Sequence, residues 1–300
     1  MNEQTSPRPS RGFITVATGK EKYYWLAWHL LHSYRFHTGE PLPFAILCDK
    51  ENRYTKDFDQ VILLKEAIGS YNDKLRLPDY VPYAETIFVD ADTLAYGDLN
   101  VLFDVFAEAP DFSALGQTLP FDAEICWFHP EDTGIWRDRL HFCNWFQGGI
   151  YYLRSSDTMS RLSSLCRKIY DTYGDYRFWN FTAPADEPVY ALAMSVLDLP
   201  TVHDRPEYNC FYPDASSIRC DIRTGLLEYT SRWDPQSTLI HHALRVHWGA
   251  RYTRSFLYQR EAFRLRCRVR KGHLLAFSYL LRKAGPYTAG KIRHFFRPHD

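Results

Sequence analysis

Two aspartates, Asp90 and Asp92, stand one residue apart directly after the apolar run 86–89. If that run is a buried strand, both carboxylates project into one crevice, because ligands of a parallel sheet gather beyond the carboxyl ends of its strands. Hard divalent cations prefer oxygen ligands and often complete their shell with phosphate oxygens of a substrate. A metal so held neutralises a departing diphosphate, which is the electrostatic role needed to break a sugar–phosphate bond.

A second pair with the same spacing, Asp57 and Asp59, provides an internal comparison. It precedes the apolar run 61–64 instead of following one, so it is most simply a solvated turn. The pair at 90 and 92 is followed by Thr93 and by the Gly-Asp-Leu of 97–99, and its context favours function. The alternative is an acidic loop whose aspartates cap the next helix.

The elements that must position this pair follow from the hydrophobic pattern. Short apolar runs predict strands, and stretches with apolar residues at helical spacing predict helices. Such alternation predicts an α/β fold with a mainly parallel central sheet and helices on both faces. The predicted strands are 12–18, 44–48, 61–64, 86–89, 148–153 and 239–247, and the predicted helices are 22–34 and 188–197.

The segment 88–103, FVDADTLAYGDLNVLF, resembles the metal-binding segment of GT-A fold glycosyltransferases, especially the family 8 and glycogenin-like group. The resemblance implies a hexosyltransferase of the retaining type that takes its sugar from a nucleotide diphosphate, most simply a UDP-sugar. It implies Mn²⁺ or Mg²⁺ as the cofactor. Asp90 would then touch both the ribose of the sugar donor and the metal, and Asp92 would be the stronger metal ligand.

Two further segments resemble the parts of this family that hold the sugar donor. The segment 14–35 resembles the opening strand and helix, where an aromatic residue stacks on the base; Tyr23 takes that place by spacing, with Tyr24 as the alternative. In the segment 72–80, Lys74 lies sixteen residues before Asp90 and would contact the diphosphate, with Arg76 as its competitor. The full set of residues expected to bind the sugar donor is Ala17, Thr18, Tyr23, Lys74, Asp90, Ala91, Gly148, Gly149 and His247.

Residues facing the transferred sugar are implied by two more segments. The segment 144–156 resembles a family strand in which an asparagine precedes the glycines, and here Gln147 stands in its place. Gly148 and Gly149 would permit close approach of the backbone to a ligand, or mark a bulge. Asp186 and Glu187 resemble a family motif at the start of a helix; the alternative is that they serve only its N-terminus. Gln147, Asp186 and Glu187 are the expected catalytic residues.

The third metal ligand is expected in the segment 237–252, which resembles the family pattern V-I-H-x-x-G-x-x-K-P-W. Aligned on the predicted strand, the ligand is His241, which completes the set Asp90, Asp92 and His241. Leu244 then replaces the family's glycine, and His247 falls in the region of the lysine. His242 and His247 remain alternatives, and a neutral imidazole beside two carboxylates suits manganese.

Composition and charge limit the other possibilities. Lys and Arg together equal Asp and Glu at 36 each, so no global field draws the chain onto nucleic acid. The seven cysteines form no zinc spacing and fit reduced thiols, and the N-terminus lacks an apolar leader. We therefore expect a cytoplasmic protein.

The charge is unevenly distributed along the chain. From residue 251 to 300 there are thirteen Lys or Arg and two acids, which predicts a basic extension after the catalytic body. The expected divisions are a disordered lead-in at 1–11, a catalytic domain at 12–252 and the extension at 253–300. The alternation of apolar and arginine residues at 263–270 suits a strand, whereas the later part suits a short amphipathic helix. Two roles would account for this extension. It could bind an anionic membrane surface and place the protein peripherally at the membrane, or it could simply pack over the catalytic domain.

Two rival functions remain. The run 87–94 also fits the nucleophile motif of haloacid-dehalogenase-like phosphatases, with Asp90 as nucleophile and Asp92 as acid/base. That motif normally opens the fold and needs a later pair of adjacent aspartates, which this sequence lacks. The other rival is a catalytically silent nucleotide- or sugar-binding protein, which would not hydrolyse a sugar donor. The acceptor, whether carbohydrate, lipid or protein, is not indicated by any residue.

Overall fold

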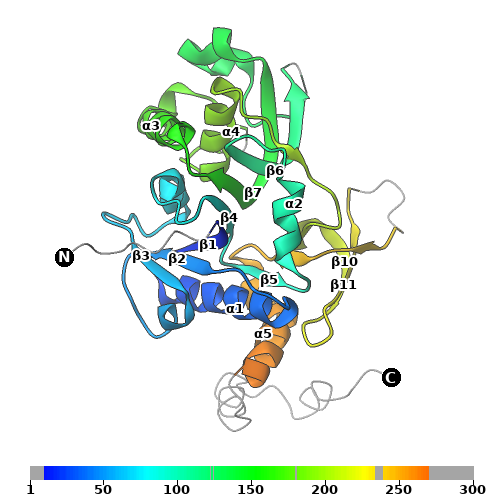
Figure 1. Ribbon diagram of the computed structural model, residues 1–300. Coiled ribbons are helices and arrows are strands. Elements are labelled where there is room, and N and C mark those ends of the chain that lie inside the picture. The colour runs from blue at the N-terminus through cyan, green and yellow to red at the C-terminus, as the bar shows by residue number, and fades with distance from the viewer. Residues whose placement is uncertain (1–9, 122, 124, 180, 234–238, 270–300) are drawn as a thin grey trace, which may run out of the picture.

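The computed structural model describes residues 10–121, 123, 125–179, 181–233 and 239–269. A seven-stranded sheet runs through the centre of the molecule in the order β3-β2-β1-β4-β7-β6-β8 (Figure 1). Its strands are β1 (Arg11–Ala17), β2 (Phe44–Cys48), β3 (Gln60–Leu63), β4 (Glu85–Val89), β6 (Phe112–Pro120), β7 (Phe142–Arg154) and β8 (Val202–His203).

Four neighbouring strands, β3, β2, β1 and β4, pair in parallel. All five residues of β2 and four of the five in β4 are buried, which is typical of parallel strands covered on both faces. The long strand β7 pairs antiparallel with β4 and β6, and β6 pairs parallel with β8. The expected mainly parallel sheet is therefore confirmed, with an antiparallel insertion beyond β4.

Helices cover both faces of the sheet. The helices α1 (Glu21–His37) and α5 (Phe256–Val269) lie on one face, and α3 (Asp157–Asp171) and α4 (Asp186–Val196) lie on the other (Figure 1). The core is divided accordingly into two clusters, because alternate residues of each strand face opposite sides: Phe13 belongs to one cluster and Ile14 to the other.

The remaining helical segments are short. They are the helix α2 (Leu102–Val105) and the 3₁₀ turns η1 (Thr55–Asp57), η2 (Tyr71–Asp79), η3 (Leu99–Val101), η4 (Pro130–Asp132), η5 (Gly134–Arg139), η6 (Tyr173–Asp175), η7 (Tyr212–Asp214) and η8 (Tyr252–Arg254).

Two three-stranded sheets lie beside the central one. The first is the hairpin of β10 (Ala215–Asp221) and β11 (Leu226–Ser231) with β12 (His241–His242). The second has the order β5-β13-β9 and contains β5 (Thr93–Ala95), β9 (Cys210–Phe211) and β13 (Arg245–His247). Because β5 follows the acidic pair directly and pairs antiparallel with β13, residue 247 is brought back to residue 93.

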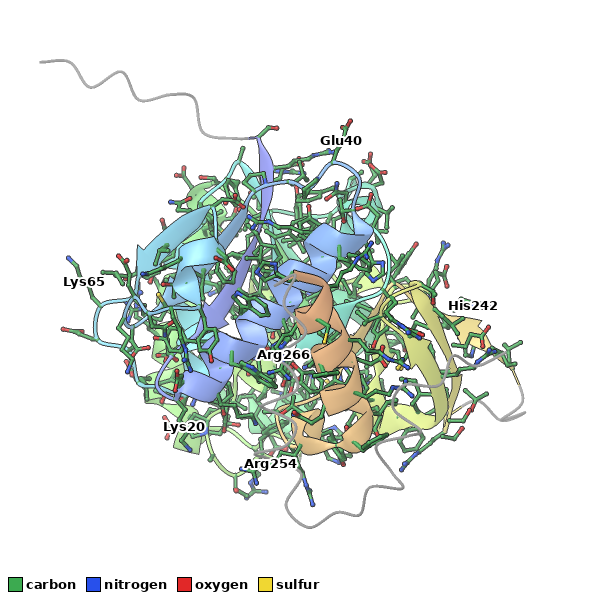
Figure 2. The ribbon with its side chains drawn as sticks, turned by 90° about the horizontal axis from the view of Figure 1, so that it is seen from below. Lys20, Glu40, Lys65, His242, Arg254 and Arg266 are labelled. Carbon is green, nitrogen blue, oxygen red and sulfur yellow. The ribbon has the colours of Figure 1, made fainter. Side chains whose placement is uncertain are left out.

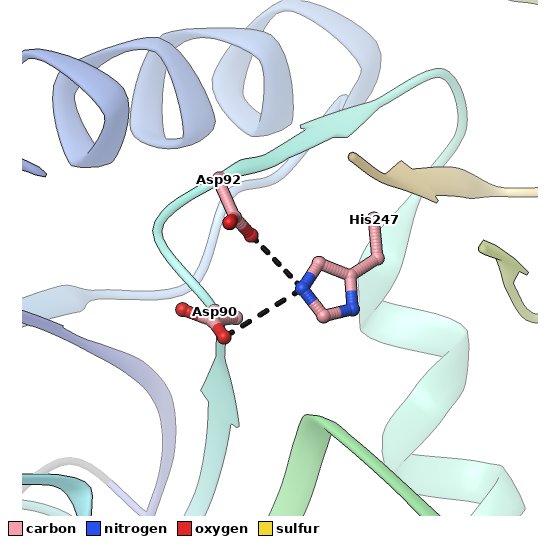
Figure 3. A group of neighbouring side chains, drawn as sticks. All are labelled: Asp90, Asp92 and His247. Atoms are coloured by element: carbon pink, nitrogen blue, oxygen red, sulfur yellow. Dashed lines mark ion pairs between the residues drawn. The ribbon is translucent and has the colours of Figure 1, made fainter. Parts of the chain in front are cut away.

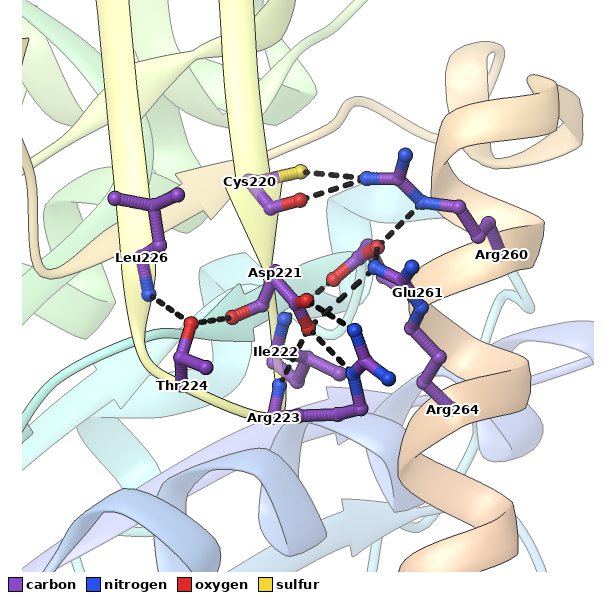
Figure 4. A network of polar contacts seen from close by, with 9 residues as sticks. All are labelled: Cys220, Asp221, Ile222, Arg223, Thr224, Leu226, Arg260, Glu261 and Arg264. Atoms are coloured by element: carbon purple, nitrogen blue, oxygen red, sulfur yellow. Dashed lines mark hydrogen bonds and ion pairs between the residues drawn. The ribbon is translucent and has the colours of Figure 1, made fainter. Parts of the chain in front are cut away.

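The segment at 263–269, for which the arginine alternation suggested a strand, belongs to helix α5. The buried residues Tyr258, Ala262 and Leu265 of α5 recur at helical spacing and belong to the same core cluster as the buried residues of α1. Beside these residues the fully buried Glu261 accepts a hydrogen bond from the backbone N–H of Ile222 and forms ion pairs with Arg260 and Arg264 (Figure 4). This network joins α5 to the β10–β11 hairpin.

The rest of the predicted extension, residues 270–300, and most of the predicted lead-in lie outside the described residues. Among the residues that the structure describes, no helix has both the length and the apolar character that crossing a membrane requires.

Candidate functional site

Asp90, Asp92 and His247 form a compact group whose ligand atoms all lie within 4.8 Å of one another (Figure 3). The Nε2 atom of His247 is 2.9 Å from Oδ1 of Asp92 and 3.6 Å from Oδ2 of Asp90. Asp90 stands at the end of β4, where its backbone N–H donates to the carbonyl of Gly149 on β7. Asp92 is fixed through its backbone carbonyl, which accepts a hydrogen bond from the N–H of Trp248, the residue directly after β13.

This group fits a divalent cation. Two carboxylates and one imidazole are suitable ligands for manganese, and a metal between them would replace the direct contacts with His247. Asp92 and His247 are both buried; within the described residues Nδ1 of His247 has no hydrogen-bond partner, and the contact of Asp92 Oδ1 is its ion pair with His247. Burial opposes ionisation of Asp90, yet Lys74 and His247 hold its pKa below the usual range, so the carboxylate is in its metal-binding form.

Lys74 connects the acidic pair to a second pair of acids. Its Nζ atom is 3.1 Å from Oδ2 of Asp90 and 3.0 Å from Oδ2 of Asp186. Burial alone would lower the pKa of Lys74, but Asp186 and Asp90 raise it above its ordinary value. The lysine is held on η2, where Tyr190 of α4 donates a hydrogen bond to its carbonyl. It is therefore a permanent cation at the centre of the site.

Asp186 and Glu187 open helix α4, and both carboxylates turn toward the site. Asp186 accepts a hydrogen bond from Tyr151, while Oε1 of Glu187 accepts one of 2.7 Å from the backbone N–H of Gly148. Burial and the neighbouring Asp186 raise the pKa of Glu187 to about 7. The carboxylates thus have specific partners outside α4, beyond any interaction with the N-terminus of their own helix.

Gly148 and Gly149 bring β7 close to these side chains. A Cβ atom on Gly149 would lie 2.7 Å from Nδ1 of His247, and one on Gly148 would lie 2.9 Å from Cγ of Glu187. The pairing of β6 with β7 shifts register between Ala114 and Gly116, opposite this stretch of β7, so the strand is also bulged here. The bulge is therefore present, and close approach of this backbone to a ligand stays a prediction.

A pocket of about 120 Å³ opens beside Asp90 and Asp92. It brings together five of the residues predicted to hold a sugar donor: Thr18, Tyr23, Lys74, Asp90 and Ala91. Tyr24 and Arg76, the alternatives to Tyr23 and Lys74, do not line this pocket. The buried Tyr24 donates a hydrogen bond to Asp49, and Arg76 forms an ion pair with Asp79. The rest of the lining is Asp92, predicted as a metal ligand, together with Val16, Ser70, Tyr71 and Ala250, which the sequence analysis did not single out.

The prediction that His241 completes the metal group is wrong for this structure. His241 lies on β12 and pairs with Tyr229 of the hairpin, in a different sheet from His247. The predicted strand 239–247 is broken at 243–244, where the backbone carbonyl of Leu244 accepts hydrogen bonds from Tyr96 and Gly97. No clear signal in the sequence marks His247, because one residue separates it from Gly249, whereas the family pattern has two residues between its histidine and its glycine.

Two polar residues complete the surroundings. Gln147 is half-buried and accepts a hydrogen bond of 3.1 Å from Asn209, and it is absent from the residues lining the pocket. Arg245 was not predicted from the sequence. It is almost fully buried on β13, and its Nη1 atom would lie 3.3 Å from a Cβ on Gly149. Burial lowers the pKa of Arg245 to about 10, and the nearby acids Asp204, Asp90 and Asp92 oppose this shift.

No protein-family profile and no curated protein matches the sequence. By structure the chain is similar to an active-site mutant of LgtC, with a TM-score of 0.51 and 12% identity over 85% of this chain and 94% of that one. For the galactosyltransferase LgtC in complex with donor and acceptor sugar analogues, the TM-score is 0.49 and the sequence identity is 11%, over the same shares of the two chains. For the glycosyltransferase GlyE of Streptococcus pneumoniae, the TM-score is 0.41 and the sequence identity is 16%. That match covers 67% of this chain and 47% of the GlyE chain. The chain therefore has the GT-A fold.

Proposed function

We propose that this protein is a metal-dependent glycosyltransferase that uses a nucleotide diphosphate sugar, most simply a UDP-sugar. The observation that carries the proposal is the Asp90–Asp92–His247 group beside a pocket that Lys74 and Tyr23 also line. A GT-A fold alone does not establish a reaction, because one fold supports many functions. Two acids, one imidazole and a buried lysine around one pocket fit the binding of a metal-associated diphosphate.

The proposed roles follow from the contacts of each side chain. A bound Mn²⁺ or Mg²⁺ would supply positive charge to the diphosphate leaving group. Lys74 adds a cation that burial between Asp90 and Asp186 keeps in place. Tyr23 offers an aromatic surface to the base. Thr18, which also lines the pocket, directly follows Ala17, the last residue of β1.

The acids of α4 are proposed to face the transferred sugar. Asp186 and Glu187 can accept hydrogen bonds from sugar hydroxyls or stabilise positive charge at the anomeric carbon. Gln147 and the backbone of Gly148 and Gly149 lie on the adjacent strand β7 and would limit the space for that sugar. A hexose and retention of configuration are our proposals for the sugar and the outcome.

The acceptor is proposed to be a carbohydrate, free or carried on a lipid or protein. Attachment to an anionic membrane surface remains a proposal that rests on the basic composition of 253–300, most of which lies outside the described residues. A phosphatase is disfavoured, because Asp90 follows the fourth strand instead of opening the fold, and the sequence lacks a later pair of adjacent aspartates.

Calorimetric titration of UDP into the protein, with Mn²⁺ and with a chelator, tests the proposal. We expect binding that requires the metal and that falls at least tenfold in Asp92→Asn and His247→Ala, since each removes a ligand. His241→Ala is the matched control and should bind as the wild type does. No metal-dependent binding of UDP or of another nucleoside diphosphate would refute the proposal, and hydrolysis of a UDP-sugar would distinguish an enzyme from a silent binder.

A further inference from the structure

A second and larger pocket, of about 520 Å³, lies between helix α1, the turn η8 and helix α5. Figure 2 shows α1 and α5 side by side, with Arg266 between them. Lys20 and Arg254 lie near the ends at which these two helices begin. The lining residues come from these elements and from the segment at 53–54: Glu21, Lys22, Trp25, Trp28, Arg53, Tyr54, Thr253, Arg254, Gln259 and Arg266. None of them belongs to the metal group, and the volume suits a small organic molecule.

The charge of this pocket favours an anion. Four of its ten residues are cations and one is an acid, and that acid, Glu21, is paired with Arg53 at 2.9 Å. Lys22 donates to a backbone carbonyl, that of Ala250, and Arg254 is exposed with no ion pair within the described part of the chain. Burial and the charge of Arg254 lower the pKa of Lys22, so these cations oppose one another until an anion lies between them.

The aromatic part of the lining favours a ligand that also has a flat or weakly polar surface. Trp25 and Trp28 stand one helical turn apart on α1, and the ring nitrogen of Trp28 donates to Asp57. The guanidinium of Arg266 lies 5.6 Å from the ring centre of Trp25. Arginine and tryptophan at one place combine a phosphate-binding fork with a broad contact surface, so a bare inorganic anion would leave the aromatic side of the pocket without a contact.

The two pockets share a wall. Ala250 lines the metal-side pocket, and its carbonyl accepts a hydrogen bond of 2.6 Å from Lys22 and one of 2.9 Å from Thr253. On α1, Lys22 lines the larger pocket and its neighbour Tyr23 lines the smaller one. A molecule held in the larger pocket is therefore adjacent to the proposed reaction site.

We propose that this pocket binds a phosphorylated saccharide, with the phosphate on Arg254, Arg266 and Lys22 and the sugar against Trp25. The composition of residues 270–300, with seven Lys or Arg and one acid, has the same sign as the pocket and does not complement its charge. Binding itself does not depend on the transferase proposal. That the bound molecule presents the acceptor, or is the product, rests on the proposed function.

Glucose 6-phosphate is the probe, titrated into the full-length protein in the presence of a chelator to silence the metal site. We expect saturable binding that weakens as salt rises and is about tenfold weaker in Arg254→Ala and Arg266→Ala, since each removes a charged hydrogen-bond donor. Arg161→Ala, on α3 at the other face of the sheet, is the matched control and should bind normally. Asp92→Asn should also bind normally, so failure of the transferase proposal leaves this result unchanged.

Three results would overturn the proposal. The first is no binding of glucose 6-phosphate, and the second is equally tight binding of glucose or of inorganic phosphate alone. The third is binding that is lost in Asp92→Asn but retained in Arg254→Ala, which would place the ligand at the metal site. A lipid headgroup is the remaining source of phosphate. Sedimentation with phosphatidylglycerol vesicles that Arg254→Ala abolishes, without binding of glucose 6-phosphate, would assign the pocket to the membrane instead.

Discussion

Lys74 is the side chain on which the charges of the site converge. Its ammonium lies between Asp90 and Asp186, so one cation serves both the metal group and the acids at the start of α4. Three charged groups in so small a volume cost desolvation, and their mutual attraction offsets that cost only while all three keep their geometry. The arrangement therefore couples the position of the metal ligands to the position of the acids that are proposed to face the sugar.

The substitution Gly149→Ala tests how strictly one residue controls that geometry. The added methyl would lie 2.7 Å from Nδ1 of His247, a distance that ordinary Cβ contacts do not reach, so the imidazole must move. We expect metal-dependent UDP binding to weaken by about tenfold or more, as for other losses of support around a metal ligand. Gly39→Ala is the matched control, because nothing in the described structure lies within 4 Å of its Cβ. Unchanged binding in Gly149→Ala, measured by the same calorimetry, would contradict this prediction.

At the scale of elements, the short strand β13 is as important to the site as the long strands of the sheet. It pairs antiparallel with β5 and parallel with β9, and its central residue Val246 is fully buried. Arg245 and His247, on either side of Val246, therefore face the opposite direction, toward Gly149. Three residues thus fix both the imidazole and a buried guanidinium beside the acidic pair.

The sequence predicts the elements of the sheet better than it predicts this strand. The run 44–48 is apolar throughout and 86–89 is apolar after Thr86, and they agree with β2 and β4 to within one residue at each end. The run 239–247 looks like one strand, but its two halves pair with different sheets. That division depends on hydrogen bonds from Tyr96 and Gly97 to Leu244, which are far apart in sequence. Pattern alone therefore selects His241, whereas tertiary pairing selects His247.

Helix α5 is the element whose attachment can be tested most directly. Removing the fully buried Glu261 by Glu261→Ala leaves Arg260 without its acid, leaves Arg264 with Asp221 at 3.4 Å, and leaves the N–H of Ile222 without its acceptor. We expect the free energy of unfolding to fall by about 3–5 kcal/mol, as for other broken buried ion pairs. Glu21→Ala breaks the exposed pair with Arg53 and should cost less than about 1 kcal/mol. Urea unfolding measures both, and equal small losses would show that the network does not hold α5.

At the scale of the whole molecule, the site exists only in the complete fold. Its side chains come from η2, the end of β4, the start of α4 and β13, which span residues 74 to 247. The carboxyl ends of parallel strands provide the common edge, as expected for α/β sheets. The sequence indicates that edge through Asp90 and Asp92, but no pattern in it predicts that β13 completes the site.

This concentration of buried acids predicts how the stability of the whole protein depends on pH. The pKa of Glu187 is raised from 4.5 to about 7 by burial and by Asp186, so the unfolded chain releases this proton at lower pH than the folded one. The stability that this group contributes is complete below pH 4.5 and is lost as pH rises through 7. Asp204, whose pKa burial raises to about 6, acts in the same direction.

Glu187→Gln isolates this contribution, because glutamine stays neutral and can still accept the hydrogen bond from Gly148. A shift of this size corresponds to about 3 kcal/mol, and partial exposure of the side chain reduces the expected effect to about 1–2 kcal/mol. In a chelator, the variant should match the wild type near pH 5 and exceed its free energy of unfolding by that amount at pH 8. Urea unfolding at both pH values gives the comparison, with Glu108→Gln as the exposed control.

A difference between Glu187→Gln and the wild type that does not change with pH would mean that Glu187 ionises normally in the folded protein. Its proposed role beside the sugar would then have to be that of an ordinary carboxylate.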